Sequence, residues 1–338
     1  MMKRKLMCLM TALLALVLVL TGCSGKSGVK VPKELEPYVI PWERNVVEEA
    51  KADGKMHYYF MSGEGGEYDG GDVRQKWGDS CLIVFPDGTT MLMDSGTEPY
   101  GKVLQVNLKK LGIEKLDYFV LSHPHSDHAY GVALGGALDD IALGEVFYNG
   151  VYNADWGDVK AVENFSSSKG ATATILRKGD VVTIGGVTIE VLWPQSEMVG
   201  QTLDSTPDIN NASMVMRFDY GEHSSLFTGD LYLGGERDIM AEQGEKLDVD
   251  LLEMCHHGDD TSNHKGFADA VTPELSVATG YVYVRNQTYA GYTAHGGKVL
   301  LDMQDGYIHV AAGSDGVMTS ETSRQRENNP YAQYEYKG

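Results

Sequence analysis

A six-residue segment with four potential metal ligands constrains this chain more than any other feature. It reads His123-Pro124-His125-Ser126-Asp127-His128 and lies just after the mostly apolar run from Leu116 to Leu121. The packing of a fold gives no reason to crowd three imidazoles and a carboxylate into one loop. Neutral imidazole and carboxylate are, however, ligands that suit Zn²⁺. The segment therefore predicts a metal centre.

The spacing within this segment favours two ions. Residues two apart in an extended loop point to the same side, so we expect His123 and His125 to share one ion, while Asp127 and His128 turn toward a second. Two ions about 3.5–4 Å apart activate water at neutral pH and hold both sides of a hydrolytic displacement. These residues predict a two-metal hydrolase.

Two later motifs extend the segment into a family pattern. Thr228-Gly229-Asp230 follows the strand-like Ser225-Leu226-Phe227, and Cys255-His256-His257-Gly258 follows the strand-like segment from Val249 to Met254. With these three motifs in this order, the chain resembles the metallo-β-lactamase superfamily, and within it the branch typified by the hydrolase domain of the ComEC competence protein. The resemblance covers roughly residues 55 to 320.

The resemblance also implies the fold, an α/β sandwich of the metallo-β-lactamase type with two mixed sheets and outer helices (αββα). The local patterns agree with it. Strand-like runs and turns alternate in both halves, as in Cys81 to Phe85 before Pro86-Asp87-Gly88. Gly101 to Gly112 has helical spacing, and the strand after it would deliver His123 at a strand's carboxyl end, the usual place for a site in an α/β layer.

By resemblance, the metal ligands would be His123, His125, Asp127, His128, Asp230 and His256. The first two would hold one ion, the next two the other, and the second aspartate would bridge them. For the remaining place in the second site we expect His256, the first histidine to leave the strand, with His257 supporting it. The ions implied are two Zn²⁺, with Mn²⁺ as the alternative.

The first metal site lacks the third histidine that is usual in the superfamily. Between Ala129 and Asp230 the only histidine is His223, in a sequence that predicts a hairpin turn, where we expect a solvated side chain. The ComEC-like branch is rich in asparagine before the equivalent strand, and Asn210 and Asn211 stand there. We expect these residues or water to complete a weak, partly occupied first site.

Several other residues are candidates for supporting roles. Asp94 ends a strand where the family often has an aspartate that supports a metal-binding histidine, and an ordinary turn aspartate is the alternative. His264 could reach substrate or be a solvated loop residue, and His295 lies where the family often brings a histidine near the phosphate side. Asp259 replaces the serine that commonly follows His-His-Gly, which puts the inherited substrate preference in doubt.

The beginning of the chain predicts a lipoprotein. Lys3-Arg4-Lys5 precede the apolar stretch from Leu6 to Leu20, which is too short to span a bilayer comfortably, and Leu20-Thr21-Gly22-Cys23 resembles a bacterial lipobox. We expect a signal peptide at 1–22, a lipidated tether and extension at 23–54, the hydrolase-like domain at 55–320 and a C-terminal tail at 321–338. The protein would then be extracytoplasmic and anchored in the membrane of the bacterial cell envelope.

Charge limits the partners. The net charge is −20, and loss of the three cations in the signal peptide leaves about −23. Such a chain repels polyanions at long range, which makes duplex nucleic acid an unlikely substrate. Of the four cysteines, Cys81 and Cys255 remain after processing and lipidation. We expect Cys81 to be buried and Cys255 to pack at a strand end, with a metal role for Cys255 and a disulfide between the two as alternatives.

These features favour a metal-dependent hydrolase in which Asp127 orients or deprotonates the attacking water. Resemblance to the ComEC-like branch favours a phosphodiester substrate, either a small molecule or a short strand. A lactone or β-lactam hydrolase is the alternative enzyme. A non-catalytic, metal-containing binding lipoprotein is the alternative from another class, kept open by the missing third histidine.

The lipobox yields a direct test. Replacing Cys23 by alanine removes the acylation site, so Cys23→Ala should release the protein from membranes or stall its processing, as followed by fractionation and mass. A variant that stays in the membrane fraction at the mature size would refute the lipobox assignment.

Overall fold

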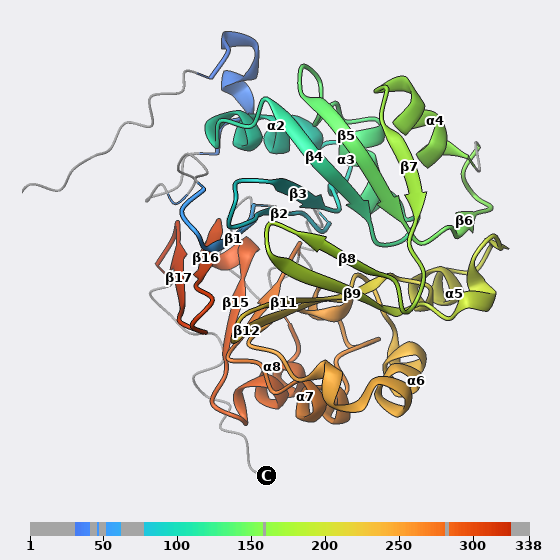
Figure 1. Cartoon of the computed structure of the whole chain (residues 1–338), viewed down its shortest axis with the longest axis vertical. Coiled ribbons are helices and arrows are strands. Elements are labelled where there is room, and N and C mark those ends of the chain that lie inside the picture. The colour runs from blue at the N-terminus through green and yellow to red at the C-terminus, as the bar shows by residue number, and fades with distance from the viewer. Residues whose placement is uncertain are drawn as a thin grey trace, which may run out of the picture. The chain divides into compact units, whose positions relative to one another are not determined.

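The computed structural model describes residues 31–40, 46, 52–61, 78–157, 160–280 and 284–325. Two large β-sheets, one eight-stranded and one seven-stranded, form its centre (Figure 1). In spatial order, the first sheet contains β17 (Met318–Thr322), β16 (Ile308–Ala312), β1 (Met56–Phe60), β2 (Cys81–Val84), β3 (Thr90–Met93), β4 (Lys115–Leu121), β5 (Ala142–Tyr148) and β7 (Thr172–Ile175). The second contains β15 (Lys298–Leu301), β14 (Leu275–Ala278), β13 (Leu251–Glu253), β12 (His223–Phe227), β11 (Val215–Tyr220), β9 (Val187–Trp193) and β8 (Val181–Ile184).

Helices cover the outer faces of the two sheets. The α-helices are α2 (Gly101–Lys110), α3 (Ser126–Ala133), α4 (Ala161–Ser168), α5 (Thr206–Asn211), α6 (Leu233–Gln243), α7 (Lys265–Val271), α8 (Asn286–Thr293) and α9 (Asp302–Asp305). Short elements complete the described chain: the 3₁₀ helices η1 (Lys33–Tyr38), η2 (Ser196–Met198), η3 (Gly244–Leu247) and η4 (Cys255–Gly258), and the pair β10 (Thr202–Leu203) and β6 (Tyr152–Asn153). Apolar side chains of α2 and α3 pack on the first sheet, and those of α6, α7 and α8 pack on the second.

The strands near the centre are buried on both faces, which explains why their sequences are continuous apolar runs. In β2, Cys81 and Ile83 face the second sheet, whereas Leu82 and Val84 face the helices, as the two-residue period of a strand requires. In β13, Leu251 faces the first sheet and its neighbour Leu252 faces α7 and α8. The two faces of these strands therefore contribute to three apolar layers, one between the sheets and one between each sheet and its outer helices.

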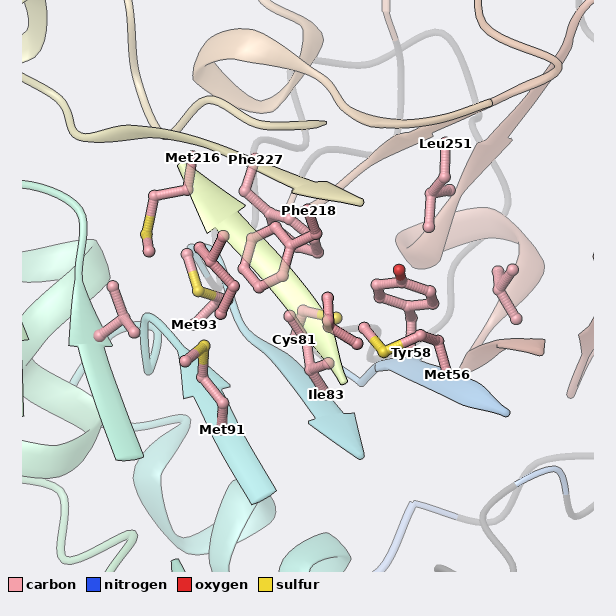
Figure 2. Close-up of a cluster of buried hydrophobic side chains, with 14 of the residues drawn as sticks. Met56, Tyr58, Cys81, Ile83, Met91, Met93, Met216, Phe218, Phe227 and Leu251 are labelled. Carbon is pink, nitrogen blue, oxygen red and sulfur yellow. The ribbon is translucent and has the colours of Figure 1, made fainter. Parts of the chain in front are cut away.

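The layer between the sheets is rich in aromatic and sulfur-containing side chains (Figure 2). Phe227 of β12 stacks near Phe60 of β1, with ring centroids 6.2 Å apart, and contacts Phe218 of β11 edge-on at 5.4 Å. Each fully buried side chain of this size contributes about 1.5–3 kcal/mol through removal of apolar surface from water. This layer fixes the position of one sheet against the other.

Parallel strands in both sheets deliver their carboxyl ends to the candidate site. Strands β3, β4 and β5 are parallel neighbours in the first sheet, and β12, β13 and β14 are parallel neighbours in the second. The His123 segment follows β4, Asp230 follows β12, and His256 follows β13. Three segments far apart in the sequence therefore converge, as expected for an α/β layer.

The predicted sandwich of two mixed sheets with outer helices is confirmed. One local expectation is wrong: His223 is the first residue of β12 and is 1% exposed, with Nε2 3.0 Å from the hydroxyl of Tyr58, because that strand extends into the predicted turn. The expected boundary at 320 falls inside β17, and the segment limits stay predictions.

The predicted signal peptide and lipobox lie outside the described residues, as do most of the tether and most of the C-terminal tail. Within the described ranges, no helix is both long and apolar enough to cross a membrane.

Candidate metal centre

The histidine-rich segment connects β4 to α3. His125 precedes the helix with an extended backbone (φ −101°, ψ 156°), and Asp127 and His128 lie in the first helical turn. The expectation of a fully extended loop is therefore wrong for these last two residues. Because successive helical residues differ in direction by about 100°, their side chains still diverge.

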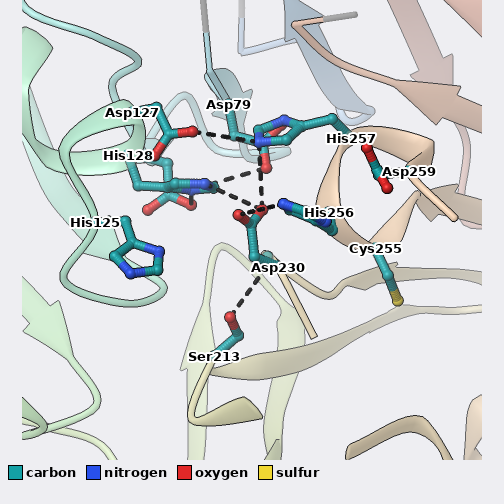
Figure 3. Close-up of polar contacts among 12 residues, drawn as sticks. Asp79, His125, Asp127, His128, Ser213, Asp230, Cys255, His256, His257 and Asp259 are labelled. Carbon is teal, nitrogen blue, oxygen red and sulfur yellow. Dashed lines mark hydrogen bonds and ion pairs between the residues drawn. The ribbon is translucent and has the colours of Figure 1, made fainter. Parts of the chain in front are cut away.

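Asp230 lies at the centre of the converging segments and is 1% exposed. Its backbone N–H donates to Ser213 Oγ at 3.0 Å (Figure 3). The preceding Gly229 has φ 51°, and a Cβ at this position would lie 2.8 Å from Ser122 Oγ. Glycine thus lets the Asp230 turn pass against the end of β4.

His256 and His257 leave β13 with left-handed backbones, φ 47° and 58°. This conformation costs an L-residue about 1–2 kcal/mol, so the surrounding structure must hold both residues in it. The backbone N–H of His256 donates to the Gly229 carbonyl at 2.9 Å, which ties the pair to the Asp230 turn. The two neighbouring rings consequently approach different oxygens of one carboxylate.

One oxygen of Asp230, Oδ1, faces two histidines. His128 Nε2 lies 3.1 Å from it and His257 Nε2 lies 3.4 Å from it. His257 Nε2 also lies 3.6 Å from Oδ2 of Asp127 (Figure 3). The structure therefore places His257, rather than the predicted His256, against His128 and Asp127.

The other oxygen, Oδ2, faces the remaining histidines. His256 Nε2 lies 3.6 Å from it and His123 Nε2 lies 3.7 Å from it. His125 joins this side through Nδ1, which is 3.0 Å from His123 Nε2. His256 thus lies on the side of Asp230 where the sequence lacked a third histidine.

The arrangement has the chemistry of a cation site. The contact between His128 Nε2 and Asp230 Oδ1 does not have the geometry of a hydrogen bond. Both atoms are buried, and neither has a hydrogen-bond partner among the described residues. Buried polar atoms normally have partners. Zinc–ligand bonds of 2.0–2.2 Å place tetrahedral ligands about 3.3 Å apart, which is close to the spacing found here. The residues fit metal ions on both sides of Asp230.

Electrostatics also favour a cation. Burial would raise the pKa of Asp230, but His128, His257 and His256 outweigh it and hold that pKa well below its usual range. Burial lowers the pKa of His123 well below its usual value, which leaves this imidazole neutral and able to coordinate. Burial likewise opposes a charge on His128, but Asp230 and Asp94 outweigh it and raise the pKa of His128 well above its usual value.

Two aspartates support histidines from behind. Asp94 Oδ2 lies 2.8 Å from His128 Nδ1, the contact expected of a supporting carboxylate. Asp79, which sequence reasoning missed, lies 3.2 Å from His257 Nδ1 and 3.8 Å from His128 Nδ1. Asp79 groups with His128, Asp230 and His257 as a possible ligand, but its contacts are to the Nδ1 atoms, opposite the Nε2 atoms that face Asp230. We therefore assign it a supporting role.

The residues around Asp79 do not form a recognisable metal-binding motif. Asp79 ends a glycine-rich stretch and is 178 residues from His257. The one signal is Gly78, where a Cβ would lie 1.8 Å from the Asp127 carbonyl oxygen, so only glycine lets this segment approach α3.

Among the described residues, the hydrogen bonds of the asparagine pair lead away from both histidine groups. Asn211 Oδ1 accepts the Gly235 N–H at 2.9 Å in the first turn of α6, and Asn210 is buried in α5. From this part of the chain, Ser213 reaches Asp230 instead. Asn210 Oδ1 is buried and has no hydrogen-bond partner among the described residues, so a role for this residue at the first site stays a prediction.

The other candidate histidines lie outside both groups. His264 caps α7 by accepting the Gly266 N–H at 3.1 Å, and His295 pairs with Asp269 at 2.9 Å in an exposed position. Cys81 and Cys255 are both free and buried, so the structure contains no disulfide between them.

A family model described as the metallo-beta-lactamase superfamily matches residues 76–274, more than half of the chain. The chain belongs to the metallo-β-lactamase superfamily, and its buried histidine and aspartate cluster is that of a metal-dependent hydrolase of this superfamily.

Among curated relatives, competence protein ComA of Neisseria gonorrhoeae is 27% identical over 240 residues, which cover 70% of this chain and 30% of that protein. ComE operon protein 3 of Bacillus subtilis is 25% identical over 237 residues, 65% of this chain and 29% of that protein. The chain thus spans about 30% of the length of these relatives. The metallo-beta-lactamase fold protein YhfI of Bacillus subtilis aligns with a TM-score of 0.46 and 15% identity, over 73% of this chain and 96% of that one.

A buried carboxyl group braces the segment after His257. Glu236 of α6 accepts the backbone N–H groups of Asn263 and His264, and burial raises its pKa from 4.5 to about 7. The folded protein therefore keeps a proton here up to about pH 7, whereas the unfolded chain loses it above pH 4.5. The contribution of this protonated carboxyl group to the free energy of unfolding is fully present below pH 4.5 and is lost as the pH rises through 7.

Glu236→Gln should remove this pH dependence. Between pH 5 and pH 8, the free energy of unfolding of the metal-free wild type should fall by about 3 kcal/mol more than that of the variant, since one pKa unit corresponds to about 1.4 kcal/mol. Urea unfolding of both proteins at the two pH values measures the difference. Parallel changes in the two proteins would show that Glu236 titrates normally.

Proposed function

We propose that this protein is a surface-anchored, metal-dependent hydrolase that cleaves a phosphodiester. The observation that carries the hydrolytic part is the division of histidines between the two oxygens of Asp230. In this proposal Asp230 is shared by two metal sites, as a carboxylate with two separate lone-pair faces allows.

The first site would contain His123 Nε2, His125 Nδ1 and His256 Nε2, and the second would contain Asp127, His128 Nε2 and His257 Nε2. Each site would then have three ligands of its own plus one oxygen of Asp230, and water or substrate would enter by expansion to five-coordination, as catalytic zinc sites allow. His256 takes the place that the sequence left to Asn210, Asn211 or water. A complete first site removes the main argument for a non-catalytic binding protein.

Bound metal would lower the pKa of water and stabilise negative charge on the attacked group. Asp127 is the carboxylate best placed to work with that water, because its side chain is 14% exposed while that of Asp230 is 1% exposed. Asp127 would orient the water and accept its proton as the new P–O bond forms and the bond to the leaving alcohol breaks. Asp230 would stay fixed as the shared ligand.

The phosphodiester preference is supported by the three motifs shared with the ComEC-like branch and by the similarity to ComA and ComE operon protein 3. A net charge of −20 favours a small or short substrate over a duplex. The proposed location rests on the lipobox at Cys23 alone. Turnover of chromogenic phosphodiesters, lactones and β-lactams by the zinc-loaded protein tests the substrate class; hydrolysis of lactones or lactams with no phosphodiester turnover would overturn it.

Substitutions should separate the roles of the two aspartates. Asp127→Asn keeps an oxygen ligand but removes the base, so we expect most of the metal to remain and turnover to fall about 10²-fold or more. Asp230→Ala should lose both metal and activity. Asp140→Asn, at a carboxylate with 84% side-chain exposure, is the charge-matched control. Near-normal turnover by metal-loaded Asp127→Asn would sink the assigned role.

A further inference from the structure

The histidines on the two sides of Asp230 differ in what holds their Nδ1 atoms. On the Oδ1 side, both partners are carboxylates. Asp94 Oδ2 lies 2.8 Å from Nδ1 of His128, and Asp79 Oδ1 lies 3.2 Å from Nδ1 of His257. All four of these side chains are buried, so little water screens the contacts.

On the Oδ2 side, two histidines have hydroxyl partners instead. Ser122 Oγ lies 3.0 Å from Nδ1 of His123, and Thr261 Oγ1 lies 2.5 Å from Nδ1 of His256. The Ser122 hydroxyl donates its own proton to Asp94 at 2.6 Å, so its oxygen is left to accept from the His123 N–H.

Thr261 is held in a comparable way. Asp259 Oδ1 accepts the backbone N–H of Thr261 at 3.2 Å and lies 3.4 Å from its hydroxyl. Asp259 therefore turns toward Thr261. On this side of Asp230, a hydroxyl stands between the Nδ1 atom of each of these two histidines and the carboxylate behind it.

This difference has a chemical consequence. A carboxylate that accepts the Nδ1 proton increases the electron density at Nε2 and makes the imidazole a stronger ligand, and a neutral hydroxyl does so much less. The second site also has Asp127 as a charged ligand of its own, whereas the first has three neutral imidazoles. Both effects make metal binding at the second site stronger than at the first.

Building on the two-site assignment proposed above, we infer that Ser122, Thr261, Asp79 and Asp94 are positioning residues that make the sites unequal: the second holds its ion tightly and the first holds an exchangeable ion. The protein would then have a stable one-metal state, and the second equivalent of metal would be gained or lost as the free zinc concentration changes. Thr261, with Asp259 behind it, sets the affinity of the exchangeable ion through His256.

The experiment is graded chelation of the zinc-loaded full chain, with the ions per protein counted by native mass spectrometry. Wild type should lose its two ions in separate steps. Thr261→Val should lower the affinity for the ion that is lost first by about tenfold, and Thr261→Ser, which keeps the hydroxyl, should restore that affinity. Asp79→Asn should instead lower the affinity for the ion that is lost last by about 10–100-fold, the usual effect of removing the hydrogen-bond partner of a metal ligand. If Asp79→Asn fails to fold, Thr261→Val alone decides, since it should weaken the binding of the first-lost ion and leave the affinity for the last-lost ion unchanged.

Simultaneous loss of both ions from the wild type would overturn the inference. So would a lower affinity for the first-lost ion alone in Asp79→Asn. His256→Ala and His257→Ala test the ligand assignment separately. Each should remove one ion, the exchangeable ion in the first variant and the tight ion in the second. Unchanged ion counts in both would reject the proposed ligand sets, whereas correct counts with equal affinities would reject only the inferred inequality.

Discussion

The carboxylate of Asp230 is the point on which the rest of the site depends. It is buried, and a buried carboxylate is stable only when surrounding groups compensate its charge. Its turn is held from three directions. Ser213 accepts its backbone N–H, Gly229 passes against Ser122, and the Glu253 carboxyl group accepts the N–H groups of Thr228 and Gly229 at 2.9 and 3.2 Å. With the turn fixed, its two oxygens face two separate groups of histidines.

Those groups exist because two sheets supply them together. The His123 segment belongs to the first sheet, whereas Asp230 and the His256-His257 pair belong to the second. The apolar layer around Phe227 sets the distance between the sheets, so packing far from the site determines the spacing of atoms within it. The left-handed backbones of His256 and His257 are a local cost that this rigid frame maintains.

The surroundings of the histidines give the site a further level of organisation. Asp94 contacts the end of β4 through Ser122 and α3 through His128, and thus couples ligands on both sides of Asp230. The role of Asp259 follows from its contacts in the fold rather than from its place in the sequence. It comes after His257 and Gly258 in the sequence, yet it braces Thr261 behind His256. Membership of the superfamily does not decide such details, because function depends on the particular site.

The sequence by itself determined the layered fold and most of the metal-binding chemistry. Apolar runs mark strands buried on both faces, and the His-x-His-x-Asp-His spacing is a local pattern that survives even though Asp127 and His128 turned out to be helical. Only the tertiary structure decided how the His256-His257 pair divides between the sites, because two left-handed residues send adjacent rings to different oxygens of Asp230. It alone revealed Asp79, since a contact between residues 178 positions apart leaves no periodic signal in the chain.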